Sequence, residues 1–179
     1  MPQQRFCHVM GVEGLAVTLA HRHGVDPNSV LTAALLHDYA KAEPQDRLRE
    51  LMARGVDHRP SEEDLKHPAM WHGIAAAHLG RSEFGIDDLR VLEAVAFHTT
   101  GNEGLNPVGL VLYVADFLEP TRNFNGVEAL RREILPMKDL RLAALEVARR
   151  KIDKIQRKNQ SLHGRTLAMA DWLKRETGK

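Results

Sequence analysis

A run of apolar residues that ends in two side chains of metal-ligand type constrains the fold of this chain more than any other feature. Residues 30–36 read Val-Leu-Thr-Ala-Ala-Leu-Leu, and His37, Asp38 and then Lys41 follow them. A helix that runs on to Lys41 is apolar on nearly every side, which predicts that it lies in the core. On such a helix His37 and Asp38 are about 100° apart, so both can face one cavity, and Lys41 shares the face of His37.

Burial of these polar side chains requires partners that compensate their polarity. A divalent metal with a phosphate substrate would compensate the histidine, the aspartate and the lysine together. The alternative is a core histidine that is satisfied by the neighbouring aspartate. This segment alone fits both interpretations, so the rest of the chain has to decide between them.

The pattern of apolar residues predicts helices along the whole chain and no strand. Proline or glycine marks most of the expected helix boundaries. We expect helices over about residues 6–23, 27–41, 44–53, 67–80, 87–98, 107–119, 138–160 and 164–176, with a short helical turn at 61–65. Because no repeat or linker divides the chain, residues 1–179 are expected to form one all-α domain, a helical bundle around a buried metal site.

Composition narrows the classes of function. The formal net charge is +1, which argues against bulk electrostatic binding of nucleic acid or of an anionic membrane. No run of 18 apolar residues is present, so no membrane span is expected. The N-terminus has no signal-peptide pattern, and Cys7 is the single cysteine, so a cytoplasmic protein without a disulfide is expected.

Polar side chains of metal-ligand type recur at the ends of apolar stripes on five of the predicted helices. They are His8, His37, Asp38, His72, His98 and Asp116. A polar residue on an apolar stripe is costly unless it is paired, which favours one shared ligand. Imidazole and carboxylate together suit iron, manganese, zinc or cobalt, and the lack of cysteine ligands argues against a structural zinc site. With six ligands and a carboxylate that can bridge, the set has room for two metals roughly 3.5–4 Å apart.

The same residues carry a resemblance to a known superfamily. His8, the His37-Asp38 pair and Asp116 resemble the signature of HD-domain metal-dependent phosphohydrolases, and His72 and His98 resemble the additional ligands of its dinuclear members. Longer segments resemble the YqeK family, the bacterial HD-type symmetrical bis(5′-nucleosyl)-tetraphosphatases. These segments are RFCHVMGV at 5–12, HDYAK at 37–41, WHG at 71–73, FHTTG at 97–101 and ADFLEPTR at 115–122. The resemblance extends from Arg5 to about Trp172.

The resemblance implies a dinuclear iron centre, or a similar one with manganese or cobalt, and hydrolysis of diadenosine tetraphosphate to two ADP. Two cations lower the pKa of a water enough for it to attack phosphorus near neutral pH, so the reaction class agrees with the ligand types. We expect Asp38 and Lys41 to be catalytic: Asp38 is of the right type to bridge the metals, and Lys41 would neutralise polyphosphate charge.

Two other interpretations keep the metal site. In one, the protein hydrolyses a different nucleotide, such as a deoxynucleotide, a nucleoside triphosphate or a guanosine alarmone. In the other, it is a non-catalytic regulator that senses a metal or a nucleotide. The expected partner is a small nucleotide; a homodimer is left open, and neither a membrane nor a specific nucleic acid is expected.

A second group of residues is expected to contact the substrate. It comprises Arg5, Lys41, His67, Thr99, Thr100, Gly101, Arg122 and Asn123. Residues 99–101 follow a ligand and could cradle a phosphate with hydroxyl and N–H groups, or form a plain helix-ending turn. Arg122 and Asn123 are expected to clamp phosphate or base, the alternative being a surface loop, and His67 could instead cap a helix. We expect His163 to be ordinary and the basic stripe of helix 138–160 to be solvated.

Overall fold

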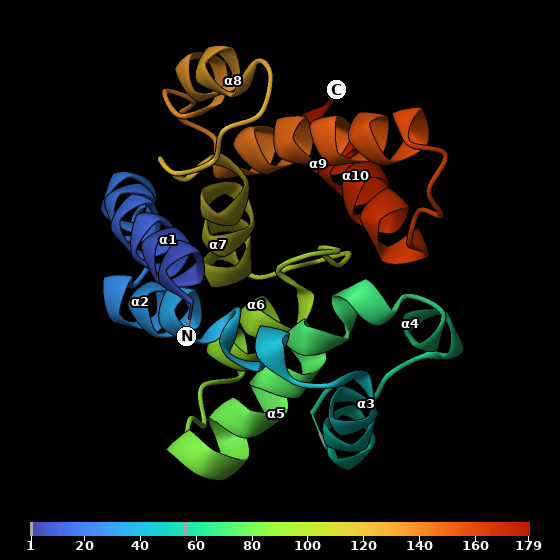
Figure 1. Cartoon of the computed structure of the whole chain (residues 1–179). Helices are drawn as coiled ribbons and strands as arrows, with labels where there is room; N and C mark the ends of the chain where they lie inside the picture. The colour runs from blue at the N-terminus through green and yellow to red at the C-terminus, as the bar shows by residue number, and fades with distance from the viewer. Residues whose placement is uncertain (1, 56) are drawn as a thin grey trace.

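The computed structural model describes residues 2–55 and 57–179, which form helices and no strand (Figure 1). The expectation of an all-α fold is therefore confirmed for these residues. The elements are α1 (Gln3–His23), α2 (Pro27–Leu36), the 3₁₀ helix η1 (Tyr39–Ala42), α3 (Gln45–Arg54), α4 (Glu62–Leu65), the 3₁₀ helix η2 (Pro68–Met70), α5 (Trp71–Phe84), α6 (Leu89–Phe97), α7 (Pro107–Leu118), α8 (Val127–Ile134), α9 (Leu140–Arg157) and α10 (Gly164–Thr177). None of these helices is long and apolar enough to cross a bilayer.

Helix α7 is the element around which the others pack. Asn106 caps its first turn by accepting from the amides of Val108 and Gly109, and every residue from Val108 to Leu118 is buried. A helix that is apolar on all sides is stable only when other elements cover each side. Accordingly α1 and α2 contact α7 on one side, α9 on another, and α6 on a third (Figure 1).

Helix α2 ends earlier than the sequence pattern predicts. The expected helix through Lys41 is wrong, because α2 ends at Leu36 and His37 is its C-terminal cap. Asp38 has left helical geometry, with φ −103° and ψ 11°, and η1 follows. As a result Lys41 pairs with Asp38 rather than sharing the face of His37, and its Nζ donates to the two carboxylate oxygens at 2.9 and 2.8 Å.

One further helix boundary departs from expectation, and one helix was not predicted. Helix α5 continues past Gly80 to Phe84, and Gly85 at φ +64° ends it. Gly80 is needed inside the helix because a Cβ there would press on the Leu36 side chain. Helix α8 is absent from the sequence prediction, although Val127 and Ile134, its buried residues, lie seven positions apart on one helical face.

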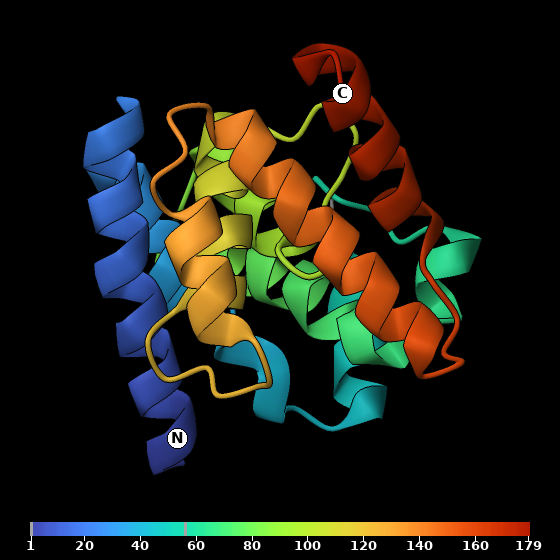
Figure 2. The same cartoon turned by 90° about the horizontal axis from the view of Figure 1, so that it is seen from above.

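Helices α9 and α10 form the remaining side of the molecule. Asp139 caps α9, His163 caps α10, and the two helices contact each other (Figure 2). The buried side of α9 carries small residues, Ala143, Ala144 and Ala148, and α9 contacts both α7 and α10. This arrangement places the second half of α9 near the residues that follow α6 and α7.

Candidate active site

The structure brings together all six side chains of metal-ligand type, from five helices and the turn after α2. His8 lies on α1, His72 on α5 and Asp116 on α7, whereas His37 and His98 are the C-terminal caps of α2 and α6. Their exposed fractions run from 0% for His37 to 9% for His8. Six buried side chains of metal-ligand type that meet in one place suit a shared cation.

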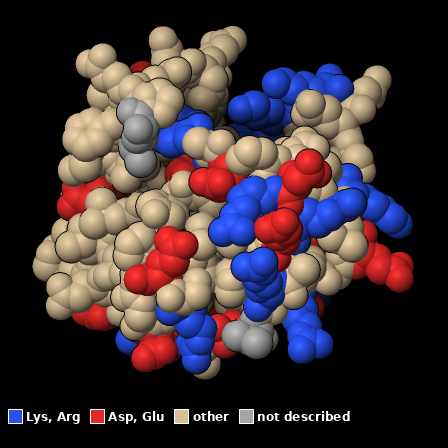
Figure 3. All heavy atoms as spheres, turned by 60° about the horizontal axis from the view of Figure 1, so that its bottom comes forward, with Lys and Arg blue, Asp and Glu red and all other residues tan. Residues whose placement is uncertain are grey.

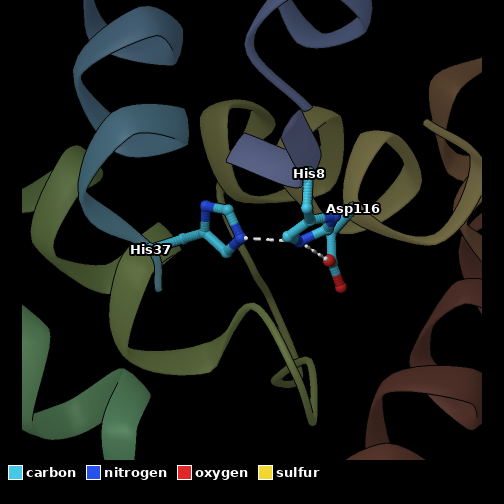
Figure 4. Close-up of side chains that lie close together, drawn as sticks. All are labelled: His8, His37 and Asp116. Atoms are coloured by element: carbon cyan, nitrogen blue, oxygen red, sulfur yellow. Dashed lines mark hydrogen bonds and ion pairs between the residues drawn. The ribbon is translucent and has the colours of Figure 1, made fainter. Parts of the chain in front are cut away.

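The cluster has two halves. In the first, His8 Nε2 lies 3.3 Å from His37 Nε2 and 3.3 Å from Asp116 Oδ1 (Figure 4). In the second, His72 Nε2 lies 3.2 Å from His98 Nε2 and 3.3 Å from Asp38 Oδ1.

Asp38 lies between the halves. Its other carboxylate oxygen, Oδ2, is 3.8 Å from His8 Nε2. Potential ligand atoms of His37, Asp38 and His98 also fall within 4.8 Å of one another, as do those of His8, His37 and Asp116. The arrangement offers two adjacent sites with a carboxylate between them.

Hydrogen bonds to the outer ring nitrogens orient the histidines. The Nδ1 atoms of three rings lie against the backbone carbonyl three residues earlier: His37 on Ala34 at 2.6 Å, His72 on Ala69 at 3.0 Å and His98 on Val95 at 2.8 Å. A carbonyl only accepts, so in each ring Nδ1 carries the proton and the lone pair of Nε2 points into the cluster. The lone pairs of His72 Nε2 and His98 Nε2 therefore oppose each other 3.2 Å apart and repel one another, and a cation between them removes that repulsion.

The protonation states agree with metal binding. Burial lowers the pKa of His37 to about 4 and also lowers the pKa of His72. Burial likewise lowers the pKa of His8, but the hydrogen bonds with Asp116 and Glu119 outweigh it and raise that pKa, so a cation would displace a proton from His8 on binding. Burial raises the pKa of Asp116, but the hydrogen bond with His8 and the charge of Lys151 outweigh it and hold that pKa well below its ordinary value. Neutral imidazole and ionised carboxylate are the forms that bind metals, so the residues fit a divalent cation.

Glu119 is a member of this site that the sequence analysis missed. It is fully buried, accepts from His8 Nδ1 at 3.0 Å, and also accepts from the amide and hydroxyl of Thr121 at 2.6 and 2.7 Å. Gly11 on α1 makes room for it, because a Cβ at that position would overlap the Glu119 carboxylate. The signal was its position three residues after Asp116, on the same side of the helix.

A cavity of about 330 Å³ opens next to the cluster and reaches His72 and Asp116. Its wall carries an excess of positive charge. The basic residues are Lys41, Arg122, Lys151, Lys154 and Lys158. The space-filling view in Figure 3 shows a hollow bordered by Lys and Arg side chains, whereas acidic and basic side chains are mixed over the rest of that face. A basic cavity beside a metal-ligand cluster suits a polyanionic substrate.

Three of the residues expected to contact substrate line this cavity. Lys41 pairs with Asp38, and Arg122 places Nη2 2.6 Å from Asp116 Oδ1. Thr99 is the third, and its buried hydroxyl has no hydrogen-bond partner among the described residues.

Thr100 and Gly101 are held by packing instead. The hydroxyl of Thr100 donates to the Gly101 carbonyl at 2.9 Å. Gly101 has φ +71°, and a Cβ there would overlap Met169 of α10. Neither residue lines the cavity, so the expected phosphate cradle over 99–101 is reduced to Thr99, and the other two residues form the helix-ending turn.

Arg5, His67 and Asn123 also lie outside the cavity wall. Arg5 is half-buried on α1, and Asn123 is exposed in the loop after α7. The ring of His67 is 4.9 Å from that of His163, which does line the cavity.

The expectation that the basic stripe of α9 is solvated is wrong for Lys151, which is half-buried in the cavity wall, whereas Lys154 and Lys158 are exposed as expected and also line the cavity. Lys151 Nζ lies 3.6 Å from the centre of the Tyr113 ring and 3.3 Å from the Thr99 carbonyl oxygen. Burial lowers the pKa of Lys151 to about 8. The available signal was the i, i+3, i+7 spacing of these lysines, which places them on one face.

Comparisons with known proteins agree with this site. The HD domain family model matches residues 5–121, a range that includes all six ligand-type residues. The chain belongs to the HD-domain family. The symmetrical bis(5′-nucleosyl)-tetraphosphatase of Bacillus subtilis is 33% identical over 97% of this chain and 91% of its own length, and that of Halalkalibacterium halodurans is 32% identical over 97% and 90%. The expected relationship to these enzymes is confirmed.

The fold of this HD-domain protein is also found in a solved structure. The crystal structure of a "predicted HD superfamily hydrolase involved in NAD metabolism" from Clostridium acetobutylicum has a TM-score of 0.90 and 32% identity, and the match covers 98% of this chain and 92% of that one. The HD-domain match itself ends at residue 121. The metal-ligand cluster therefore lies within the family domain, whereas the α9 lysines of the cavity wall lie beyond it.

Proposed function

We propose that this HD-domain protein hydrolyses diadenosine tetraphosphate symmetrically to two ADP, at a centre of two divalent metals. The observation that carries the proposal is the six-residue cluster with a carboxylate between its halves, open to a basic cavity. The names of the relatives over nearly the whole chain support this substrate.

The residues are proposed to divide between two metals. His8, His37 and Asp116 would hold one, His72 and His98 the other, and Asp38 would serve both. We propose iron as the native metal, with manganese or cobalt as functional substitutes, because imidazole and carboxylate donors suit all three. When bound, two divalent ions polarise the phosphoryl group and supply a nucleophile near neutral pH.

The chain's own charges would position the polyphosphate. Arg122 is held by the Asp116 carboxylate and by the Asp116 carbonyl at 2.9 Å, so its guanidinium is oriented before substrate enters. Lys41, whose side chain is 40% exposed, presents its ammonium to the cavity. These cations, with Lys151, would stabilise the negative charge that develops on the phosphoryl oxygens. ADP is a good leaving group, so the chain need not supply a strong acid.

Turnover of diadenosine tetraphosphate by protein purified without oxygen tests the proposal. Fe²⁺, Mn²⁺ and Co²⁺ are supplied in turn, and the products are separated by ion exchange. We expect ADP as the sole product, and loss of activity and of bound metal in Asp38→Ala. Asp171→Ala, at an exposed position of α10, is the matched control.

Two results would contradict the proposal. ATP plus AMP as products would refute symmetrical cleavage, and full activity with full metal content in Asp38→Ala would refute the assignment of the site. A panel of other nucleotides would then identify the substrate.

Two expectations of cellular context are also proposals. A nucleotide substrate and the single cysteine suit the reducing cytoplasm, where we place the protein. The homodimer stays a prediction.

A further inference from the structure

A second hollow adjoins the cavity beside the metal-ligand cluster. It has a volume of about 550 Å³ and lies between α8 and α9, next to the loop at Phe124. We call it the α8–α9 groove. Phe117, Phe124, Lys154 and Lys158 line both hollows, so the two are continuous at these residues.

The lining of the α8–α9 groove combines aromatic rings with unpaired positive charge. The rings of Phe117 and Phe124 are 5.4 Å apart, and Lys154 Nζ lies 5.3 Å from the centre of the Phe124 ring. Within residues 2–55 and 57–179, no carboxylate oxygen lies within 4.0 Å of the side-chain nitrogens of Lys154, Arg157 or Lys158. Aromatic faces beside cations are the combination that binds a nucleobase and its phosphates without reading the base edge.

The α8–α9 groove also carries more basic than acidic side chains. Arg150, Lys154, Arg157 and Lys158 line it, against Glu133 and Asp153, and the Glu133 carboxylate is engaged by Arg150 at 3.7 Å. An apolar side is supplied by Ala129 and Leu130 of α8. A nucleoside with a phosphate chain matches a half-apolar, half-cationic surface of this kind.

The proposed substrate has two identical halves and is cut at its centre. When the central phosphates lie at the metal-ligand cluster, the two nucleosides must extend from it along separate paths. The cavity of about 330 Å³ is at the small end for a single ligand of this class. We propose that the α8–α9 groove binds the second nucleoside of a dinucleoside polyphosphate, and that Lys154 and Lys158 hold the phosphate bridge at the junction. This inference rests on the proposed function.

Binding measured without turnover tests the groove separately from the reaction. The probes are the diadenosine tetraphosphate analogue whose central bridging oxygen is a methylene, and adenosine 5′-tetraphosphate with the same methylene, which has four phosphates and one nucleoside. Calorimetric titration of the Mn²⁺-loaded wild type should give an affinity at least about fivefold higher for the analogue, because stacking of one more base is worth about 1–3 kcal/mol. The single-nucleoside probe carries more negative charge, so charge alone would favour the opposite order.

Ala129→Trp fills the groove from α8 and should abolish the difference between the probes, leaving binding of the single-nucleoside probe within about twofold. Ala53→Trp, at an exposed position of α3, is the matched control and should keep the difference. Arg157→Glu reverses a charge in the groove and should also reduce the difference between the probes, whereas Arg132→Glu, at an exposed position of α8, should keep it. This second pair of variants tests the groove even if Ala129→Trp does not fold.

The inference is overturned if the wild type binds both probes equally, or if folded Ala129→Trp and Arg157→Glu retain the wild-type preference. A wild type that does not hydrolyse diadenosine tetraphosphate would refute the proposed function by a different measurement. A wild type that neither hydrolyses diadenosine tetraphosphate nor prefers the two-nucleoside probe would overturn both the proposed function and this inference.

Discussion

Glu119 provides a test of whether the metal centre depends on a carboxylate that is not proposed to bind metal. It accepts from His8 Nδ1 at 3.0 Å and from the Thr121 amide at 2.6 Å. Glu119→Gln preserves the volume but replaces one carboxylate oxygen by an amide nitrogen, which only donates. One acceptor oxygen then remains where the wild type has two, so the ring of His8 loses part of the restraint that turns Nε2 toward the cluster.

The magnitude follows from the charge of the acceptor. A hydrogen bond to a charged group contributes about 1.5–3 kcal/mol and one between neutral groups about 1 kcal/mol, so the His8 contact should weaken by about 0.5–2 kcal/mol. Loss of an outer hydrogen-bond partner of a metal-binding histidine costs about 10- to 100-fold in metal affinity. We therefore expect the affinity for Co²⁺ or Mn²⁺ to fall about tenfold in Glu119→Gln.

Competition with a chromophoric chelator measures that affinity directly, without substrate. Glu83→Gln, at an exposed position of α5, controls for loss of one carboxylate and should match the wild type. Activity at limiting metal should fall in parallel and recover when excess metal is supplied. An affinity within twofold of wild type, in a Glu119→Gln protein with an unchanged circular dichroism spectrum, would refute the role assigned to this carboxylate.

Three further changes probe other parts of the structure. Lys151→Met keeps the aliphatic stem but removes a cavity charge, so KM for diadenosine tetraphosphate should rise about tenfold while metal content, by elemental analysis, stays constant. Gly101→Ala should destabilise the fold by about 2–4 kcal/mol in urea unfolding, because φ is +71° and the methyl meets Met169. Asp64→Asn should cost about 3 kcal/mol at pH 7, since Asp64 is buried and accepts from Arg165 Nη2 at 2.6 Å. Burial raises the pKa of Asp64, but the hydrogen bonds from Arg165 and Ser61 outweigh it, so the net effect is a lowered pKa. The stability of the wild type over Asp64→Asn should therefore be constant above about pH 5 and shrink below about pH 4, where the carboxylate becomes protonated.

The metal-ligand cluster was predictable because its members lie on or at the end of apolar stripes. His8 is followed on its face by Val12, and Asp116 lies in a helix buried along its length. Such positions are costly without a shared partner, so the sequence pattern alone indicated that they meet. The arrangement of the six residues into two halves was not predictable, since it depends on how five helices cross.

The end of α2 shows why the position of Asp38 was not predictable either. No proline or glycine lies between Leu36 and Lys41 to mark the end of the helix. The chain nevertheless turns at His37, where Asp38 comes within 3.3 Å of His72 Nε2 and 2.8 Å of Lys41 Nζ. One local contact and one contact with a distant helix thus accompany a break that no proline or glycine marks.

On α9 the buried apolar stripe was predictable from the sequence, but which basic residues line the cavity was not. Ala144, Val147 and Ala148 are buried, and Lys151 continues the same stripe at the next turn. Along that stripe the small apolar side chains that pack on α7 are succeeded by lysines where the packed core gives way to the cavity. The basic residues on other faces of α9, such as Arg141, make the whole helix look solvated in sequence. Only the packing of α9 against the rest of the chain determines which of its positive charges face the cavity, and α9 lies beyond the HD-domain match.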